Sequence, residues 1–228
     1  MRKIAFTLMA VVVPIFAGFF PPTVHTTVSA VSGEDLKLSR PFPVTGMSGV
    51  VIHNFANKLE AITGYIAQVS SDGKSRLVAK EIIHHDELPT IKTPLHKGDK
   101  VIGGYLYDNV LLLAPDADTY AKITKSVHKK WFHPDLLASF LSKIGETYPT
   151  KENLARFAKK YQVGLIYIVK RNSAILFDPI SGQRVGKRAF SGTSNKVHSP
   201  FFMRLKKIEG SLFSKSVPGD YYHIMEQF

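Results

Sequence analysis

Short apolar runs alternate with turn-forming residues in the first half of the chain, a pattern typical of antiparallel strands. Three runs have the length of a strand: residues 48–55, 61–70 and 75–83. The turn at residues 71–74 contains Asp-Gly, which favours a hairpin between apolar runs. Two more runs, within residues 101–115, predict a second hairpin around Asp108 and Asn109. We therefore predict a small barrel or sandwich over residues 45–115.

The apolar positions change to helical spacing after this part. Asp116 and Thr150 are the expected N-caps of two helices. Between them, a third helix has Pro134 at its first position, Asp135 in its first turn and Gly145 just after its end. An apolar stripe at helical spacing predicts its buried face: Leu136, Leu137, Phe140, Leu141 and Ile144.

Three strands follow, at residues 164–170, 173–177 and 183–190, and the first is nearly all apolar, as a central strand would be. The pattern weakens in the C-terminal segment, where residues 201–208 add one amphipathic stretch. We predict an α+β fold: a small β-rich, barrel-like N-terminal part followed by an α+β layer with a short sheet.

The N-terminus carries a basic start, an apolar run and the small-residue pattern Val28-Ser29-Ala30. This pattern predicts a secretory signal peptide cleaved after Ala30, and an uncleaved anchor helix is the alternative. The expected organisation is a signal peptide (1–30), a lead-in (31–44), a β-rich domain (45–115), an α+β domain (116–190) and a C-terminal segment (191–228). No second apolar run is long enough to span a bilayer, so no transmembrane segment is expected after cleavage.

Composition narrows the class of protein. The chain has no cysteine, which excludes disulfides, a thiol nucleophile and zinc–thiolate sites. Its formal net charge is +12. For an exported protein this charge favours anionic envelope surfaces, glycans or acidic protein faces as partners, and we expect no nucleic acid. A solvated basic surface without a specific partner is the alternative.

Two groups of residues are candidates for chemistry. Asp178 begins the sequence Asp-Pro-Ile-Ser-Gly between two strands, which suits a β-turn better than a nucleophile or a calcium site. His84, His85, Asp86 and Glu87 form the best local metal candidate. Adjacent strand residues point to opposite faces, and zinc would need further ligands from elsewhere, so a surface loop is favoured.

No nucleophile elbow, phosphate-binding loop or apolar pair of carboxylates is visible in the sequence. We therefore expect no catalytic residue, no metal, no cofactor and no enzymatic activity. A site assembled from distant residues leaves no local spacing, and such an enzyme stays as an alternative.

Basic residues recur in pairs, and the single tryptophan follows the first pair. The candidate partner-binding residues are Lys129, Lys130, Trp131, Lys159, Lys160, Lys206 and Lys207. Trp131 precedes a predicted helix, where an aromatic side chain can fix the entry of the chain onto the core. An exposed Trp131 would instead form an interaction patch with its neighbouring lysines. For the lysine pairs, the alternative is ordinary solvated surface.

Three segments carry a resemblance: KGDKVIGGYLYDNVLLLAPDADTY, KKWFHPDLLASFLS and PTKENLARFAKKYQVGLIYIV. In this order they resemble the N-terminal domain of the plasminogen-binding surface proteins of epsilon-class proteobacteria. The resemblance implies an exported, non-enzymatic cell-envelope protein, located in the periplasm or at the cell surface, with host plasminogen as its partner. Plasminogen kringles recognise lysine, best beside a free carboxylate. This sequence ends at Phe228 without a lysine-rich extension, so we expect only weak binding through the internal lysine pairs.

The second half also resembles small periplasmic modules that end in a strand pair around a D-x-x-[ST]-G turn. Such modules recur in envelope and flagellar-motor accessory proteins. The resemblance implies a second hypothesis, a periplasmic structural or accessory subunit of an envelope machine such as the flagellar motor. The two hypotheses differ in partner, since one expects host plasminogen and the other expects other subunits of the machine.

Overall fold

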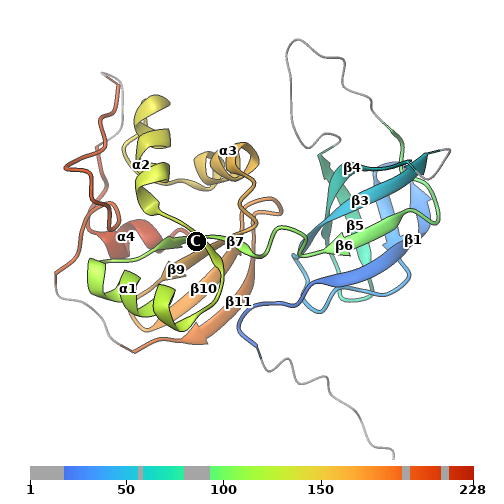
Figure 1. Cartoon of the computed structure of the whole chain (residues 1–228), viewed down its shortest axis with the longest axis horizontal. Coiled ribbons are helices and arrows are strands. Elements are labelled where there is room, and N and C mark those ends of the chain that lie inside the picture. The colour runs from blue at the N-terminus through green and yellow to red at the C-terminus, as the bar shows by residue number, and fades with distance from the viewer. Residues whose placement is uncertain (1–17, 56–58, 80–92, 192–195, 212–215) are drawn as a thin grey trace, which may run out of the picture.

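The computed structural model describes residues 18–55, 59–79, 93–191, 196–211 and 216–228. A closed barrel of six strands lies beside an α/β unit, in which helices pack on a five-stranded sheet (Figure 1). This arrangement confirms the predicted α+β fold class with a barrel-like first part.

The barrel strands follow the order β1-β2-β5-β4-β3-β6, and every neighbouring pair is antiparallel. Their bounds are β1 (Val24–Ser32), β2 (Asp35–Leu38), β3 (Ser48–Phe55), β4 (Leu59–Gln68), β5 (Lys74–Ala79) and β6 (Lys100–Gly103). Alternate residues point to opposite faces of a strand. The core-forming set in these strands is Val28, Leu36, Leu38, Val51, Ile66 and Val101. Their burial fills the barrel with side chains.

The barrel begins earlier than the β-rich domain expected at residue 45. Strand β1 starts inside the range assigned to the signal peptide, and β2 lies inside the range assigned to the lead-in. The small residues that resemble a cleavage site also suit a strand, and Val28 is only 1% exposed in the barrel core. Cleavage after Ala30 would therefore divide β1 and remove a core side chain.

One predicted hairpin is confirmed and the other is wrong. β4 and β5 pair around a turn in which Gly73 has φ of +88°. β6, however, ends in the barrel at Gly103, whereas β7 (Asn109–Leu113) belongs to the second sheet. Between them, the Tyr107 amide donates to the Gly104 carbonyl at 3.0 Å and the Asn109 amide to the Leu106 carbonyl at 2.9 Å. These successive turns carry the chain from one sheet to the other.

The second sheet has the order β11-β10-β9-β7-β8. Besides β7, its strands are β8 (Lys130–Phe132), β9 (Leu165–Val169), β10 (Ser173–Asp178) and β11 (Gln183–Ala189). β7 pairs in parallel with β8 and β9, and β10 and β11 continue antiparallel. β9 is the central strand of the five, as its apolar sequence predicts.

The three predicted helices are present as α1 (Ala117–Ser126), α2 (Pro134–Lys143) and α3 (Lys151–Tyr161). Their predicted caps form: Asp116 accepts from the Thr119 amide at 2.8 Å, and Thr150 makes a capping box with Asn153. A short helix, α4 (Tyr221–Met225), is additional to the prediction. Residues 201–208 contain neither helix nor strand, although Phe201 and Met203 are buried.

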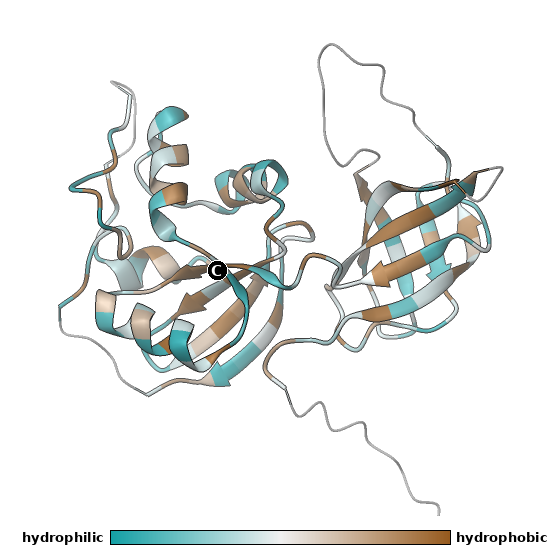
Figure 2. Cartoon of the chain, viewed as in Figure 1, coloured by the Kyte–Doolittle hydropathy of each residue, from teal (hydrophilic) through white to brown (hydrophobic). Residues whose placement is uncertain are grey.

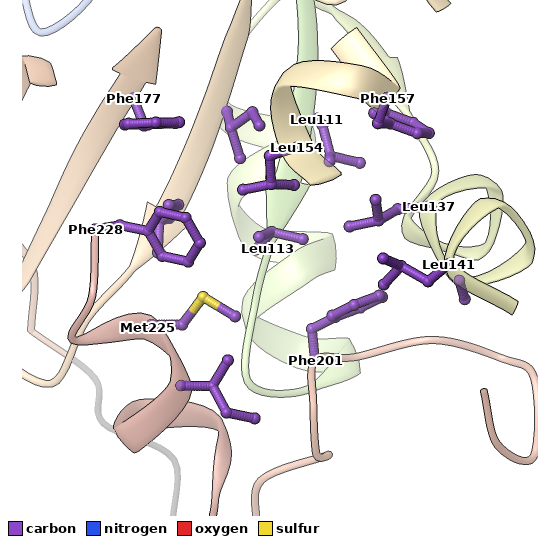
Figure 3. Packing of buried hydrophobic residues seen from close by; sticks show 14 of the residues in the cluster. Leu111, Leu113, Leu137, Leu141, Leu154, Phe157, Phe177, Phe201, Met225 and Phe228 are labelled. Atoms are coloured by element: carbon purple, nitrogen blue, oxygen red, sulfur yellow. The ribbon is translucent and has the colours of Figure 1, made fainter. Parts of the chain in front are cut away.

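The inner strands β7, β9 and β10 of the second sheet are apolar on both sides and are buried on both faces, whereas the edge strand β11 carries hydrophilic residues (Figure 2). Side chains of α2, α3, α4 and the C-terminal segment cover one face (Figure 3). Representative members of this cluster are Leu111, Leu137, Leu154, Phe177, Phe201, Met225 and Phe228. On the opposite face, Ile123 of α1 joins Val110, Leu112 and Tyr167. The α/β unit is therefore a three-layer arrangement of helices, sheet and helix.

A buried aspartate links the barrel to the α/β unit. Asp178 is fully buried, and its Oδ1 accepts from the amides of Ile180 and Ser181, at 2.8 and 3.1 Å. This bonding confirms the predicted turn, in which Gly182 has φ of +71°. Its Oδ2 accepts from the Ser48 amide at 2.9 Å and from the Tyr107 hydroxyl at 2.7 Å. One carboxylate thus closes a turn of the sheet and holds the first residue of β3.

Residues before β1 dock on the α/β unit. The Phe19 ring lies 5.3 Å from the Tyr167 ring, edge to face, and the Arg188 guanidinium lies 4.6 Å from the Phe19 centroid. The neighbouring Phe20 packs against both Phe19 and Tyr167. These contacts tie the segment that precedes the barrel to the central strand of the second sheet. Within the described ranges, no helix is long and apolar enough to span a membrane.

Candidate protein-binding surface

Trp131 lies on β8, the edge strand of the second sheet, where it is opposite Val110 of β7. Its indole N–H donates to the Val127 carbonyl at 3.0 Å, and its ring lies edge-on to Tyr167 with centroids 6.3 Å apart. The side chain is half-buried and packs against the core. These contacts favour the structural interpretation of Trp131 over an exposed interaction patch.

Lys129 is held by partners of its own. Its Nζ lies 2.7 Å from Asp108 Oδ1 and 5.2 Å from the centroid of the Phe20 ring. Only 16% of the Lys129 side chain is exposed. The hydrogen bond from Lys129 lowers the pKa of Asp108, which keeps the pair ionised. Lys130 is therefore the more accessible lysine of this pair.

Lys159 and Lys160 occupy the last turn of α3, where the helix dipole favours cations. The helix ends at Gln162, whose backbone adopts the left-handed conformation with φ of +56°. The Gln162 side chain accepts from the Tyr65 hydroxyl of the barrel at 3.1 Å, so this end of α3 lies against the barrel (Figure 1). Lys160 stays exposed, and its Nζ is 5.7 Å from the Tyr161 ring centroid.

A cavity of about 130 Å³ lies between the end of α3 and the barrel. Its lining is mainly apolar and comes from both bodies: Tyr65, Val78, Ala79, Leu106, Ala155, Ala158, Lys159, Pro179 and Ile180. The space suits one apolar side chain, with Lys159 as the cation at its border.

Lys206 and Lys207 project from a short segment that is anchored on both sides. Before it, the Arg204 amide and Nε donate to the two oxygens of Asp135, at 2.8 and 2.7 Å. Burial acts to raise the pKa of Asp135, but these hydrogen bonds from Arg204 outweigh it and lower the pKa. After it, Ile208 packs against the core. The segment is thus held against α2 while its lysines face solvent.

A carboxylate accompanies these two lysines. Lys207 Nζ lies 3.5 Å from Glu209 Oε1, and the two side chains are 75% and 71% exposed. Lys206 is exposed beside them, and Leu205 is 42% exposed. We name residues 205–209 the lysine loop. It presents ammonium groups, a carboxylate and an apolar side chain together on the surface.

The structure leaves the three lysine pairs apart: at the start of β8, at the end of α3 and in the lysine loop. Sequence reasoning found the exposed lysines but could not foresee the Lys129–Asp108 ion pair or the anchoring of residue 204. It also missed a cluster of groups able to ligate a metal, formed by His53, His96 and Asp99. His96 and Asp99 are three residues apart, but His53 lies 46 residues before Asp99, so only the strand register joins it to them. The candidate metal ligands at residues 84–87 lie outside the described residues.

The sequence is similar to a known protein family. A family model described as "Plasminogen-binding protein pgbA N-terminal" matches residues 23–226. The chain belongs to this family. The resemblance drawn from the sequence is therefore confirmed. The matched range opens one residue before β1 and closes just after α4, so the family unit comprises both the barrel and the α/β unit.

Two curated relatives carry the name "Plasminogen-binding protein PgbA". The protein of Helicobacter pylori strain J99 is 29% identical over 196 residues, which cover 83% of this chain and 42% of the relative. The protein of strain 26695 is 28% identical over 187 residues, which cover 79% of this chain and 39% of the relative. The chain spans about two fifths of the length of these relatives. No solved structure shows a significant match.

Both the family and these curated relatives are named for binding plasminogen. The described part of the chain presents exposed lysines on fixed elements, at Lys130, Lys160, Lys206 and Lys207.

Proposed function

We propose that this chain is an exported, non-enzymatic cell-envelope protein that binds a protein partner through exposed lysines, with host plasminogen as the partner. The observation that carries the proposal is the family match over residues 23–226, which covers both folded bodies. The names of the curated relatives supply the partner.

The lysine loop is the best described contact for such a partner. A module that recognises lysine beside a carboxylate needs both charges on one accessible surface. Lys207 and Glu209 provide them at 3.5 Å, and Lys206 adds a second ammonium group. Surface ion pairs of this kind contribute little to stability, so substituting them leaves the fold intact.

The other lysine pairs are weaker candidates for the main contact. Lys129 is occupied by Asp108, and Lys159 borders the cavity at the barrel. Lys130 and Lys160 are exposed, and they serve as secondary contacts. An internal lysine lacks the free carboxylate of a C-terminal lysine, so we expect modest affinity.

Binding of purified protein to immobilised plasminogen tests the proposal. The double variant Lys206→Ala/Lys207→Ala should bind at least about tenfold more weakly, because a tenfold loss corresponds to about 1.4 kcal/mol, the size of a contact residue's contribution. The lysine analogue 6-aminohexanoate should compete with the wild type.

The matched control removes two exposed lysines from another element. Lys122 and Lys125 lie on α1, and the variant Lys122→Ala/Lys125→Ala has the same change in net charge. Equal losses in both double variants would show that binding follows net charge rather than the lysine loop. Absence of binding by the wild type would reject plasminogen as the partner.

Protease treatment of intact cells tests the location. A surface protein should be digested, whereas a periplasmic subunit of an envelope machine should be protected until the outer membrane is opened. Protection, together with impaired motility in a deletion strain, would replace the plasminogen proposal with the accessory-subunit hypothesis.

A further inference from the structure

Strand register brings a histidine and an aspartate together at one end of the barrel. In the antiparallel pair of β3 and β6, Val51 lies opposite Val101 and Ile52 opposite Lys100. Extending this register by one residue sets His53 opposite Asp99. Both residues lie two positions from fully buried valines, so they continue the inward face of their strands. His53 Nδ1 and Asp99 Oδ1 are 2.7 Å apart.

A tight turn adds a second histidine. The Asp99 amide donates to the His96 carbonyl at 3.2 Å, and Gly98 within the turn has φ of +95°. The His96 amide in return donates to Asp99 Oδ2 at 2.8 Å. This turn holds the His96 ring against the His53 ring, with centroids 4.6 Å apart. The Nδ1 atom of His96 lies 3.9 Å from Asp99 Oδ2.

The three side chains offer one ligand atom each within 4.8 Å of one another. Two imidazoles and one carboxylate form a donor set typical of zinc sites that keep an open position. In a tetrahedral zinc site, bonds of about 2.0–2.2 Å separate the ligand atoms by roughly 3.4 Å. The observed separations, from 2.7 Å to at most 4.8 Å, lie on both sides of this value, so the three ligand atoms are near the spacing that one zinc ion requires.

The surroundings support a fixed site. The Asp99 side chain is only 4% exposed, and the His96 amide orients its carboxylate. The Phe55 ring packs edge-on against His53, with centroids 4.8 Å apart. The His96 side chain is 48% exposed, which opens the cluster to solvent on one side. Outer contacts of this kind hold ligands in position in metal proteins.

We propose that His53, His96 and Asp99 form a site for a divalent transition-metal ion, zinc being the best match, with one coordination position left for water or a partner's ligand. The site lies toward the end of β3 remote from the α/β unit, since the first residue of that strand, Ser48, bonds to Asp178. It is therefore separate from the lysine loop and independent of the proposed function.

Titration of the chelator-treated full chain with Zn²⁺ and Co²⁺, followed by calorimetry and by the visible absorption of cobalt, tests the site. We expect one ion per chain and the intense absorption of low-coordinate Co²⁺. His96→Ala is the decisive variant, because the His96 backbone amide, rather than its ring, bonds to Asp99. This variant keeps the turn and the His53–Asp99 hydrogen bond while it removes one ligand.

Loss of that ligand should weaken zinc binding by about 100-fold or more, since even changes outside the ligand set cost about 10- to 100-fold. The control His128→Ala removes an exposed histidine outside the cluster and should bind as the wild type does. Zinc should also raise the melting temperature of the wild type and leave that of folded His96→Ala unchanged. No binding by the wild type, or equal binding by His96→Ala, would refute the site and leave His53–Asp99 as a structural hydrogen bond.

Discussion

The substitution Asp178→Asn tests how the barrel is joined to the α/β unit. An asparagine keeps the shape of the side chain but replaces one oxygen by an amide nitrogen, which is a donor. The Oδ1 position serves the turn through the amides of Ile180 and Ser181. Oδ2 serves the barrel through Ser48 and Tyr107. With its carbonyl at the turn, asparagine presents its NH₂ group to the two barrel donors.

The magnitude follows from the number of buried donors left without an acceptor. The Tyr107 hydroxyl can rotate and accept from the new NH₂ group. The Ser48 amide keeps only its longer hydrogen bond to the Tyr107 hydroxyl oxygen, at 3.3 Å. A buried donor left this poorly satisfied costs about 1–2 kcal/mol, so Asp178→Asn should lose about that much stability. Asp178→Ala also leaves the Tyr107 hydroxyl without its acceptor, so it should lose about 3–4 kcal/mol. The two turn amides are half-exposed and can reach water.

Urea unfolding followed by circular dichroism and by the fluorescence of Trp131, the only tryptophan, measures both losses. Asp72→Asn is a suitable control, since Asp72 also bonds within a turn but is 63% exposed. Its loss should stay below about 1 kcal/mol. Wild-type stability in Asp178→Asn, or the same loss as in Asp178→Ala, would refute the division of the carboxylate between turn and barrel.

The same residue predicts a pH dependence. Burial raises the pKa of Asp178, and hydrogen bonds from Ser48 and Tyr107 oppose this rise without cancelling it. The folded state therefore holds the proton more tightly than the unfolded state. The contribution of Asp178 to stability is greatest below the ordinary aspartate pKa of about 3.9 and falls as pH rises through the raised folded pKa. The stability difference between wild type and Asp178→Asn should shrink over this pH range, and a constant difference would contradict the raised pKa.

Three further substitutions or measurements test other parts of the structure. Tyr221→Phe should lose about 1–2 kcal/mol in urea unfolding, because the buried hydroxyl lies 2.7 and 2.8 Å from the carbonyl oxygens of Leu113 and Val169. Gly103→Ala should lose about 1–3 kcal/mol in the same assay, because its Cβ would lie 2.5 Å from the buried Phe42 ring. If the N-terminus is processed, the intact mass should show cleavage before Phe19. A mature chain that starts after Ala30 would contradict the place of β1 in the barrel.

The first residues of the helices were predictable because the signals for helix initiation are local. Asp116, Thr150 and Pro134 each act on backbone groups within a few residues, and the structure places each where the sequence predicted. The turn at Asp178 was predictable for the same reason. Its bonds to Ser48 and Tyr107 were not, because they join positions 130 and 71 residues apart.

Strand partners were less predictable than strands. The runs on either side of Asp108 and Asn109 were expected to pair, yet they belong to different sheets. Strand pairing depends on which apolar surfaces become buried together, and the sequence of one strand does not identify the strand it pairs with. Val28 is a second example. Its sequence context fits a signal-peptide cleavage site as well as a strand, and only the closed barrel shows that it is buried in β1.

The candidate binding residues divide in the same way. Exposure of Lys206 and Lys207 follows from their polarity, whereas Lys129 is only 16% exposed and pairs with Asp108, a contact made just before the paired strands β7 and β8. The junction at Asp178 joins the barrel to the α/β unit and so fixes two of these surfaces relative to each other. The lysine loop is anchored to α2 in the α/β unit, and the histidine cluster lies at the remote end of the barrel. Under the proposed function, a partner bound at the lysine loop would leave the histidine cluster accessible.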